Sequence, residues 1–491
     1  MKKISVDPIT RLEGHGKIEI FVNDAGEVAN VYFQIPELRG FERFCVGRPV
    51  EELARITPRI CGVCPEAHHM AATKAIDAVF GVEPAPAGVR LRELLYNAFY
   101  VTDHTTHFYI LAGPDFIMGP QSDPAARNIL GVIHKVGLET GGAVINLRAE
   151  AAELISMIGG KQIHPVCGLP GGVSTAVTKE QQERMVQITT AQVEFAKFSL
   201  QLFDDVVLGN NDYVDLIKSD AFTHETYYMG MVDEDNKVNF YDGKIRVTGP
   251  DGAELLKFEG KDYLQHLAEH VEPYSYLVYP FLKAVGWKGF VDGKDSGVYR
   301  ASPLSRLNAS DGMATPRAQE FYEMFFKTLG KPCHFTLANH WARVVELVYA
   351  AERMVELLND PEIANPNVRT IPKEKPTVGM GVVEAPRGTL MHHYETDERG
   401  IITKANLIVA TAHNAGRMFM GVDKAAKAFV KGPNVDEGLL NLVEMTFRAY
   451  DPCHACATHS LPGEMPLILR FRKSSDGSVI REVRSDEIRK K

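Results

Sequence analysis

Two Cys-x-x-Cys pairs stand near opposite ends of the chain. Cys61 and Cys64 lie in RICGVCPEAHH, and Cys453 and Cys456 lie in DPCHACATH. Each pair can present two thiolates to one soft metal ion from the same side. If the fold brings the pairs together, the four sulfurs form a metal site. The arginine, histidines and aspartate that surround the pairs favour catalysis over a purely structural role.

The same four thiolates are also the ligand set of a structural zinc site. In zinc ribbons the two pairs are usually tens of residues apart, whereas these pairs flank nearly the whole chain. A domain with a large core of its own rarely needs a metal to hold its centre together. Soft thiolates suit nickel and iron as well, so the ligand types and spacing alone leave zinc, nickel and iron open.

Composition narrows the class of protein. The chain has 491 residues, of which 45% are hydrophobic, enough for a large buried core. Its formal net charge of −9 argues against a nucleic-acid partner. No apolar run reaches about 18 residues, so we expect no membrane span, and the N-terminus lacks the apolar core of a signal peptide. We therefore predict a cytoplasmic protein. An odd count of seven cysteines is a poor disulfide framework.

The first cysteine pair is predicted to sit on a turn and a helix start. The pattern over 48–58 is helical and stops at Pro58, and Pro65 suits the first turn of a helix that runs to Gly81. The backbone N–H groups and positive dipole end of such a helix favour a thiolate at Cys64. Upstream, residues 17–34 alternate in the manner of a β-hairpin.

The rest of the chain predicts a helix-dominated body with small β excursions. Long helices are expected over 88–112, 135–158, from a capping box at Thr178 to about 207, within 315–358 and over 434–450. Residues 377–410 read as strands, and 222–300 as a β-rich peripheral insertion. We predict an α+β, predominantly α-helical fold that forms one unit over 1–459, followed by a C-terminal extension over 460–491.

RICGVC and DPCHACATH resemble the two signatures of the nickel–iron hydrogenase large subunit. DPITRLEGHG at 7–16, RGFE at 39–42, GKQIHPVCGLPGG at 160–172 and EAPRG at 384–388 resemble further blocks of that family, in the same order. CPEAHH and CATH resemble its cytoplasmic, multi-subunit group 3 branch, which includes methyl-viologen-reducing and NAD-reducing types. The resemblance implies the hydrogenase large-subunit fold and reversible heterolytic cleavage of H2 to protons and electrons.

The resemblance also implies the ligands of the metal centre. All four cysteines would bind nickel, and Cys64 and Cys456 would bridge to an iron that carries CO and cyanide. Glu42, the main-chain carbonyl of Leu407 and His459 resemble the ligands of a buried magnesium or similar divalent ion, whose preference is for an octahedron completed by water.

Other positions match residues that act on the centre rather than bind it. Glu13 resembles the glutamate that takes a proton from a nickel-bound thiolate. Arg387 resembles the arginine over the open face of the metals, with Asp103 and Asp451 as the carboxylates that orient it. His68 resembles the histidine that hydrogen-bonds a bridging cysteine.

Electrons need a partner to leave the site. No further clustered cysteines are present to hold iron–sulfur centres. The resemblance therefore implies further electron-transfer subunits as well as an iron–sulfur small subunit. It also implies a maturation endopeptidase that cuts after His459 and removes 460–491, after which His459 can turn inward and close the site.

Two rival functions stay open on the sequence alone. The chain could be a subunit of this superfamily that has become a scaffold, although such a subunit would be expected to lose the cysteines, or a zinc-stapled structural protein. The histidines at 104 and 107 are expected to pack and hydrogen-bond rather than bind metal. Cys45, Cys167 and Cys333 are expected to be small buried hydrophobes. His454, inside the second pair, fits either a proton-path group or a residue in a polar pocket.

Overall fold

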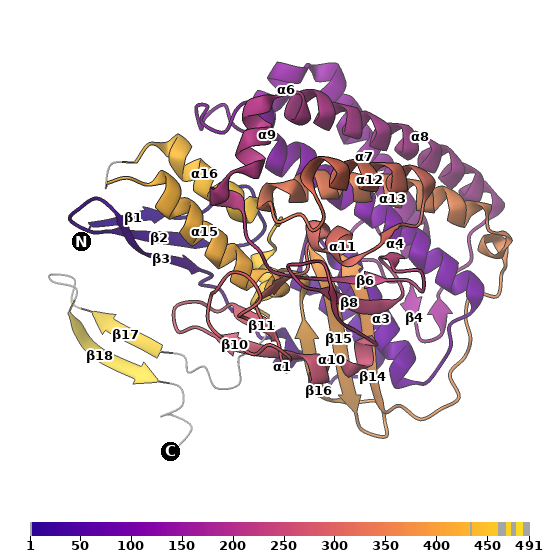
Figure 1. Ribbon diagram of the computed structural model, residues 1–491. Helices are drawn as coiled ribbons and strands as arrows, with labels where there is room; N and C mark the ends of the chain where they lie inside the picture. The colour runs from indigo at the N-terminus through magenta and orange to yellow at the C-terminus, as the bar shows by residue number, and fades with distance from the viewer. Residues whose placement is uncertain (1, 433–434, 460–467, 473–477, 485–491) are drawn as a thin grey trace.

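The computed structural model describes residues 2–432, 435–459, 468–472 and 478–484. Helices make up most of the body, and the strands form small separate sheets (Figure 1). The predicted α+β, predominantly helical class is confirmed. Within these ranges no helix is long and apolar enough to cross a membrane.

Long helices packed side by side form the largest core: α4 (Pro86–Thr106), α7 (Leu138–Gly159), α8 (Lys179–Phe203), α12 (Pro316–Leu329) and α13 (Asn339–Asn359). α4 contacts α7 and α13, and α8 contacts the same two helices. Leu91, Leu94, Leu95 and Phe99 of α4 are fully buried or nearly so, at the spacing of one helical face. The predicted capping box, formed by Thr178 with Gln181, starts α8.

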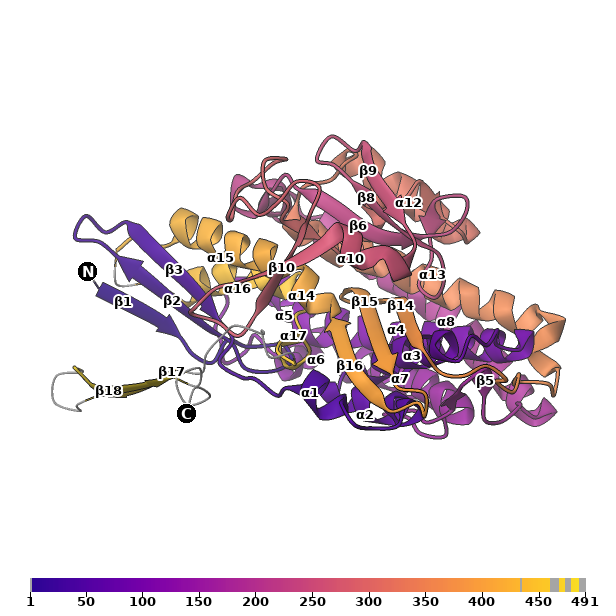
Figure 2. The same ribbon diagram turned by 90° about the horizontal axis from the view of Figure 1, so that it is seen from below.

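A three-stranded antiparallel sheet positions α3 (Pro65–Val79) and the turn that carries Arg387: β14 (Val378–Ala385), β15 (Gly388–Thr396) and β16 (Ile402–Ile408). α3 lies against β14 (Figure 2). A Cβ at Gly379 or Gly381 would come within 2.2 Å or 2.1 Å of the backbone of α3. Only glycine permits so close an approach, so these two positions set where α3, and Cys64 at its start, lie against the sheet.

A second core joins the N-terminal strands to helices from the end of the chain: β1 (Lys2–Val6), β2 (Lys17–Val22), β3 (Val28–Gln34), α15 (Ala415–Phe429) and α16 (Glu437–Arg448). Ile18 and Phe33 pack in one cluster with Met418 and Phe447. The predicted hairpin over 17–34 is confirmed, and β1 adds an unpredicted antiparallel strand. This packing places the loop between β1 and β2, which contains Glu13, beside residues from the C-terminal part of the chain.

The segment 222–300 is β-rich as predicted. A six-stranded sheet holds β6 (Tyr227–Val232), β7 (Lys237–Val238), β8 (Lys244–Thr248), β9 (Glu254–Phe258), β12 (Tyr299–Arg300) and β13 (Gly312–Met313), and a hairpin holds β10 (Leu267–Val271) and β11 (Val278–Leu282). β6 is buried along its whole length and packs on α11 (Pro303–Ala309). The peripheral placement of the insertion stays a prediction. The extent of the single unit, 1–459, stays a prediction.

Three predicted helices are interrupted in the structure. The one over 48–58 is divided into η1 (Val50–Glu52), α2 (Leu53–Ile56) and η2 (Thr57–Ile60), because Pro58 has no N–H to continue an α-helix. The one over 88–112 turns into a π-helix, η3 (His107–Ala112). The one over 135–158 is broken at Gly137, whose φ of 94° ends α6 (Ile129–Val136) before α7.

Short elements complete the described chain: α1 (Phe41–Cys45), α5 (Gly113–Ile117), β4 (Gly168–Leu169), β5 (Gly172–Val173), η4 (Asp204–Leu208), α9 (Asn211–Lys218), η5 (Asp220–Phe222), η6 (Gly260–Asp262), α10 (Tyr263–His266), η7 (Thr336–Ala338), η8 (Pro361–Ala364), α14 (Ala410–His413) and α17 (His454–Ala457). Within the C-terminal extension, β17 (Ile468–Arg472) and β18 (Val479–Arg484) pair as a hairpin that stands apart from the body in Figures 1 and 2.

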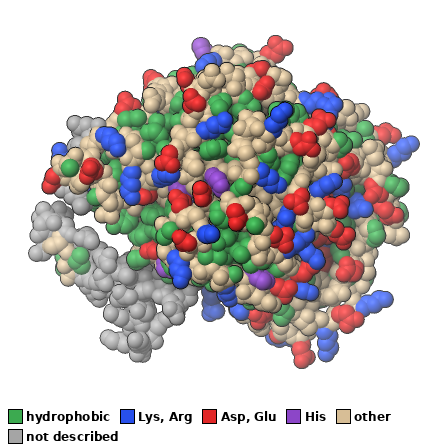
Figure 3. Space-filling view, viewed as in Figure 1, with side chains coloured by type: hydrophobic (Ala, Val, Ile, Leu, Met, Phe, Trp, Pro, Cys, Tyr) green, Lys and Arg blue, Asp and Glu red, His purple; other side chains and the backbone are tan. Residues whose placement is uncertain are grey.

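Acidic and basic side chains are interspersed over the face shown in Figure 3.

Candidate metal centre

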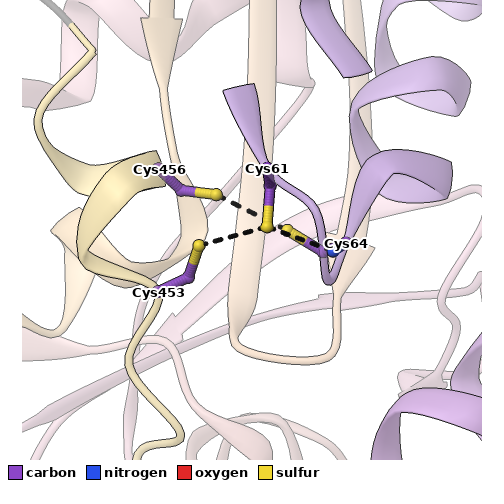
Figure 4. A group of neighbouring side chains, drawn as sticks. All are labelled: Cys61, Cys64, Cys453 and Cys456. Carbon is purple, nitrogen blue, oxygen red and sulfur yellow. Dashed lines mark hydrogen bonds between the residues drawn. The ribbon is translucent and has the colours of Figure 1, made fainter. Parts of the chain in front are cut away.

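The four cysteines of the two pairs meet in the interior. Their Sγ atoms all lie within 4.8 Å of one another, in Cys61, Cys64, Cys453 and Cys456. Sγ of Cys61 is 3.3 Å from Sγ of Cys453, and Sγ of Cys64 is 3.5 Å from Sγ of Cys456. Figure 4 shows the two pairs facing each other, one on the turn before α3 and the other at α17. The expected convergence of the pairs is therefore found.

Local backbone structure presents each pair to the other. Cys61 follows η2, and its sulfur accepts hydrogen bonds from the backbone N–H groups of Val63 and Cys64 at 3.2 and 3.1 Å. Cys64 caps the N-terminus of α3, as the proline after it predicts. Cys453 caps α17, and Cys456 lies within that short helix. Backbone N–H donors and helix starts stabilise thiolates.

The N-terminal segment ties the second pair in place. The carbonyl of Glu13 accepts a hydrogen bond from the N–H of His454 at 2.9 Å, and the N–H of Glu13 donates to Pro452 at 3.3 Å. The guanidinium of Arg39 donates to the carbonyl of Ala455 at 2.8 Å and also to that of Ile60. Arg39 thus contacts the backbone next to both cysteine pairs.

The thiols do not ionise equally. Burial acts to raise the pKa of Cys61, but hydrogen bonds from the three other thiols and the charge of Arg387 outweigh it and hold that pKa well below its ordinary value. The pKa values of Cys453 and Cys456 are raised well above the ordinary value, chiefly by burial. A bound cation would supply the positive charge that four adjacent thiolates need, so the donor set fits a soft metal centre.

Glu13 contacts the cluster directly. Its Oε2 accepts a hydrogen bond from the thiol of Cys453 at 3.0 Å and from the N–H of Ala455 at 3.1 Å. Burial, followed by the negative charge of Cys61, raises the pKa of Glu13 above its ordinary value. A carboxyl group in this place can exchange a proton with a thiol without leaving its position.

Arg387 lies between two buried carboxylates. Its Nη1 is 2.9 Å from Asp103 and its Nη2 is 2.8 Å from Asp451, and its Nε donates to the main-chain carbonyl of Asp451 at 2.6 Å. The charges of Asp103 and Asp451, and then of Cys64 and Cys453, raise the pKa of Arg387 against the opposing effect of burial. Burial raises the pKa of Asp451 to about 7. Oδ1 of Asp103 is buried without a hydrogen-bond partner among the described residues.

Two residues that the sequence did not predict hold the turn of Arg387. The guanidinium of Arg306, fully buried, donates to the carbonyls of Ala385 and Pro386 at 2.9 and 3.0 Å, and it pairs with both carboxylate oxygens of Glu346. The side-chain amide of Asn414 donates to the carbonyl of Arg387 at 2.8 Å. Both fix backbone carbonyls, so the position of Arg387 does not depend on its own side chain alone.

The three groups expected at a magnesium site lie together. Oε1 of Glu42 accepts the N–H of Leu407 at 2.7 Å and is 3.7 Å from Nε2 of His459. Nε2 of His459 is also 2.9 Å from the carbonyl oxygen of Leu407. Burial tends to lower the pKa of His459, but its contacts with Glu42 raise it overall. Two side chains and one carbonyl oxygen therefore converge where oxygen and nitrogen ligands of a divalent ion are expected.

His68 does not make the predicted hydrogen bond to a bridging cysteine. Its Nδ1 is 3.1 Å from Nε2 of His392, and its own Nε2 is buried with no hydrogen-bond partner among the described residues. No motif indicated His392, which lies four residues after the EAPRG block. His69 bonds the backbone of Ala54 and Gly168 and is a core residue.

The histidines at 104 and 107 and the cysteines outside the cluster have the packing and hydrogen-bonding roles predicted for them. His104 bonds Glu346 and His107 bonds a main-chain carbonyl, as predicted. The cysteines outside the cluster are buried with raised pKa values, chiefly because of burial: Cys45, Cys167 and Cys333. His454 packs against Phe33 with neither ring nitrogen hydrogen-bonded to a described residue, and burial lowers its pKa to about 3.

Comparison with known proteins identifies the family. The sequence profile described as nickel-dependent hydrogenase matches residues 39–132 and 216–459. Over 488 residues the chain is 47% identical to the iron-sulfur subunit of the F420-non-reducing hydrogenase from Archaeoglobus profundus, and the match covers 99% of this chain and 100% of that protein. The chain belongs to the nickel-dependent hydrogenases.

Two further relatives agree on fold and branch. The hydrogenase chain is 36% identical to the NAD-reducing hydrogenase HoxS subunit beta of Cupriavidus necator, over 95% of this chain and 96% of that one. A crystal structure of an NAD+-reducing nickel–iron hydrogenase in the H2-reduced state has a TM-score of 0.88 at 35% identity, covering 94% of this chain and all of the other. A profile described as HoxL-like matches residues 3–38. The predicted family, fold and hydrogenase activity are confirmed, and the chain is the large, catalytic subunit.

Proposed function

We propose that this subunit cleaves H2 reversibly and heterolytically, to protons and electrons, at a nickel–iron centre held by the four clustered cysteines. The observation that carries the proposal is the convergence of four buried sulfurs, from opposite ends of the chain, within 4.8 Å of one another. Glu13 hydrogen-bonds one of these sulfurs, and the charge of Arg387 acts on the same cluster. A proton acceptor and a fixed cation thus accompany a donor set suited to soft metals.

The cysteines would share the two metals unequally. All four would bind nickel, and Cys64 and Cys456 would also bind an iron with CO and cyanide ligands installed during maturation. The resemblance of the two motifs to the family's signatures supports this division, because the sulfur separations alone, 3.5 Å for this pair and 3.3 Å for Cys61 and Cys453, do not distinguish the pairs. When bound, the two metals polarise H2 and accept its electrons.

The side chains around the sulfurs accept the proton and hold the guanidinium of Arg387 in place. Glu13 takes the proton from Cys453, whose thiol already donates to it at 3.0 Å. Arg387 presents its guanidinium to the cluster while Asp103 and Asp451 hold it in place. His68 lies on α3, one helical turn after the cysteine at the start of that helix, and its Nε2 has no partner among the described residues, so it would be free to donate to a metal-bound thiolate.

We also assign a divalent ion, magnesium or similar, to Glu42, the carbonyl of Leu407 and His459. Nε2 of His459 lies 2.9 Å from the carbonyl oxygen of Leu407 and 3.7 Å from Oε1 of Glu42, which supports the assignment. Water would complete the octahedron that magnesium prefers. Such an ion would link α1, β16 and the residues after α17, and so stabilise the segment that carries the second cysteine pair.

Electrons leave, in this proposal, through an iron–sulfur small subunit in a multi-subunit cytoplasmic complex. Gly62 and Val63 are exposed although the cysteines on either side of them are buried, so this turn brings the cluster close to the surface. A hollow of about 460 Å³ lies near it, lined by aromatic and basic side chains that include Phe44 and Arg59. Aromatic residues and arginine are enriched where proteins bind one another.

Metal analysis of the purified complex tests the function. We expect nickel and iron in equal amounts in the large subunit, because four thiolates of this arrangement hold one of each, and we expect infrared bands from iron-bound CO and cyanide. Zinc in place of nickel and iron would establish the structural alternative. A chain free of metal after anaerobic purification from its own host would establish the scaffold alternative.

The C-terminal extension gives a second prediction. We expect intact mass spectrometry of active enzyme to show a chain that ends at His459, cut by a maturation endopeptidase. His459 is buried and lies 2.9 Å from the carbonyl oxygen of Leu407, which is the closed position expected of the mature chain. That cleavage precedes closure and makes it irreversible stays a prediction. A fully active species that ends at Lys491 would contradict the prediction.

A further inference from the structure

A row of buried hydrogen bonds leads from β15 to His68, and its outer members have no part in the proposed function. The hydroxyl of Tyr394 is 2.6 Å from Nδ1 of His392, and Nε2 of His392 is 3.1 Å from Nδ1 of His68. All three side chains are completely buried. At the end of the row, Nε2 of His68 has no hydrogen-bond partner among the described residues.

We propose that Tyr394 and His392 are positioning residues that fix the tautomer of His68, so that its unpartnered Nε2 carries the proton and is free to donate to a metal-bound thiolate. This inference rests on the proposed function, which places metal-bound thiolates in that cluster. It assigns a role to two residues that contact neither the sulfurs nor the metals.

The first bond of the row sets the direction of the others. A phenol is a far stronger acid than the N–H of a neutral imidazole, and a separation of 2.6 Å is in the usual range for an O–H donor. Tyr394 therefore donates to Nδ1 of His392. A neutral imidazole has one N–H, so His392 carries it on Nε2 and donates to Nδ1 of His68. The proton of His68 is then left on Nε2.

The two rings are neutral because they are fully buried and the hydrogen bonds of the row join them to each other and to a phenol, with no carboxylate in the row to balance a positive charge. Burial also lowers the pKa of His68 and of His392 below the ordinary value. Burial raises the pKa of Tyr394 well above its ordinary value. Near neutral pH each ring therefore holds a single proton, and one bond direction determines the next.

The opposite direction has one possible origin. Thr57 also interacts with the hydroxyl of Tyr394, and it could accept from that hydroxyl because its own proton goes to the carbonyl of Leu53 at 2.8 Å. Every bond would then reverse, and His68 would turn a lone pair toward the sulfurs. The negative charge of Cys61 acts on His68 and favours an N–H over a lone pair on that side of the ring, so both ends of the row favour the direction we propose.

A neighbouring pair provides a matched control. The hydroxyl of Tyr263 is 3.0 Å from Nδ1 of His393, the residue directly after His392 on β15. Successive side chains of a strand point to opposite faces, so this second tyrosine–histidine pair lies on the face away from His68. Loss of the Tyr263 hydroxyl disturbs the same strand by the same chemical change without touching the row.

Neutron diffraction from the deuterated, metal-loaded enzyme locates the protons directly. We expect a deuteron on Nε2 of both His392 and His68 and none on their Nδ1 atoms. A deuteron on Nδ1 of His68 would overturn the proposal. Nickel and iron measured on the same crystals test the proposed function separately, because the tautomer can be read whichever metal is present.

The variants Tyr394→Phe and Tyr263→Phe test the cause. Without the phenol, nothing fixes the direction of the row, so we expect the deuteron of His68 to be divided between Nδ1 and Nε2 in Tyr394→Phe. In Tyr263→Phe it should stay on Nε2. If Tyr394→Phe leaves the deuteron wholly on Nε2, Tyr394 is not the positioning residue. If Tyr394→Phe does not load metal, the map of the unsubstituted enzyme still decides the tautomer.

Discussion

Replacing Glu13 by glutamine is expected to stop exchange between H2 and the deuterons of heavy water while nickel and iron contents stay unchanged. Glutamine keeps the shape and can still meet the N–H of Ala455, to which Glu13 is hydrogen-bonded at 3.1 Å. It cannot take up the proton that the thiol of Cys453 presents at 3.0 Å. A positioned acid or base typically contributes 10²–10⁴-fold, so we expect exchange to fall by at least about 100-fold.

The control for this variant is Glu19→Gln. Glu19 lies on β2, pairs with Lys3 and Lys17, and has no contact with the cluster. Its exchange rate should match that of the unsubstituted enzyme. Near-normal exchange in Glu13→Gln, with both metals present, would remove Glu13 from the proton path.

Replacing Arg387 by lysine is expected to lower turnover by at least about tenfold, equivalent to roughly 1.4 kcal/mol of barrier. Lysine keeps the charge but not the planar fork that contacts Asp103, Asp451 and the main chain at once. Because Arg306 and Asn414 hold the turn independently, the backbone should stay in place. Metal contents are therefore expected to remain normal, and the loss should appear in H2 oxidation measured with an artificial acceptor.

Arg353→Lys is the matched control for the arginine. Arg353 pairs with Glu93 and Glu356 at the edge of α13. Arg353→Lys therefore makes the same chemical change in an arginine that forms ion pairs away from the cysteine cluster. Turnover should be unchanged there. An unchanged rate in Arg387→Lys as well would show that Arg387 is only a salt-bridge partner.

Much of the fold could be predicted because local patterns decide it. The hairpin over 17–34 and the strands of β14–β16 follow from alternation and turn residues, and α3 follows from Pro65. The π-helix at His107 has no comparable pattern, since nothing in its residues differs from those of the helix it continues. β1 was missed because a strand at the start of the chain depends on the partner it finds.

The residues of the candidate site also divide into those that the sequence could predict and those that it could not. The four cysteines could be named from their type and spacing, and Glu13 from the resemblance of its motif to the family. Arg39, Arg306 and Asn414 could not, because they bind backbone carbonyls, which every residue offers. The row from Tyr394 to His68 was hidden because it joins a strand to a helix 324 positions earlier in the chain.

The pairing of the Glu13 backbone with residues 452–454 has a consequence for how the molecule comes into being. Contacts across so much of the chain close a very large loop and form late, since the entropy of closure must be met before the contact is gained. During synthesis the N-terminal half of the site emerges first and waits for the other half. A chain that stops short of Cys453 can hold at most two of the four sulfurs. Metal loading therefore occurs only in chains whose synthesis and folding are both complete.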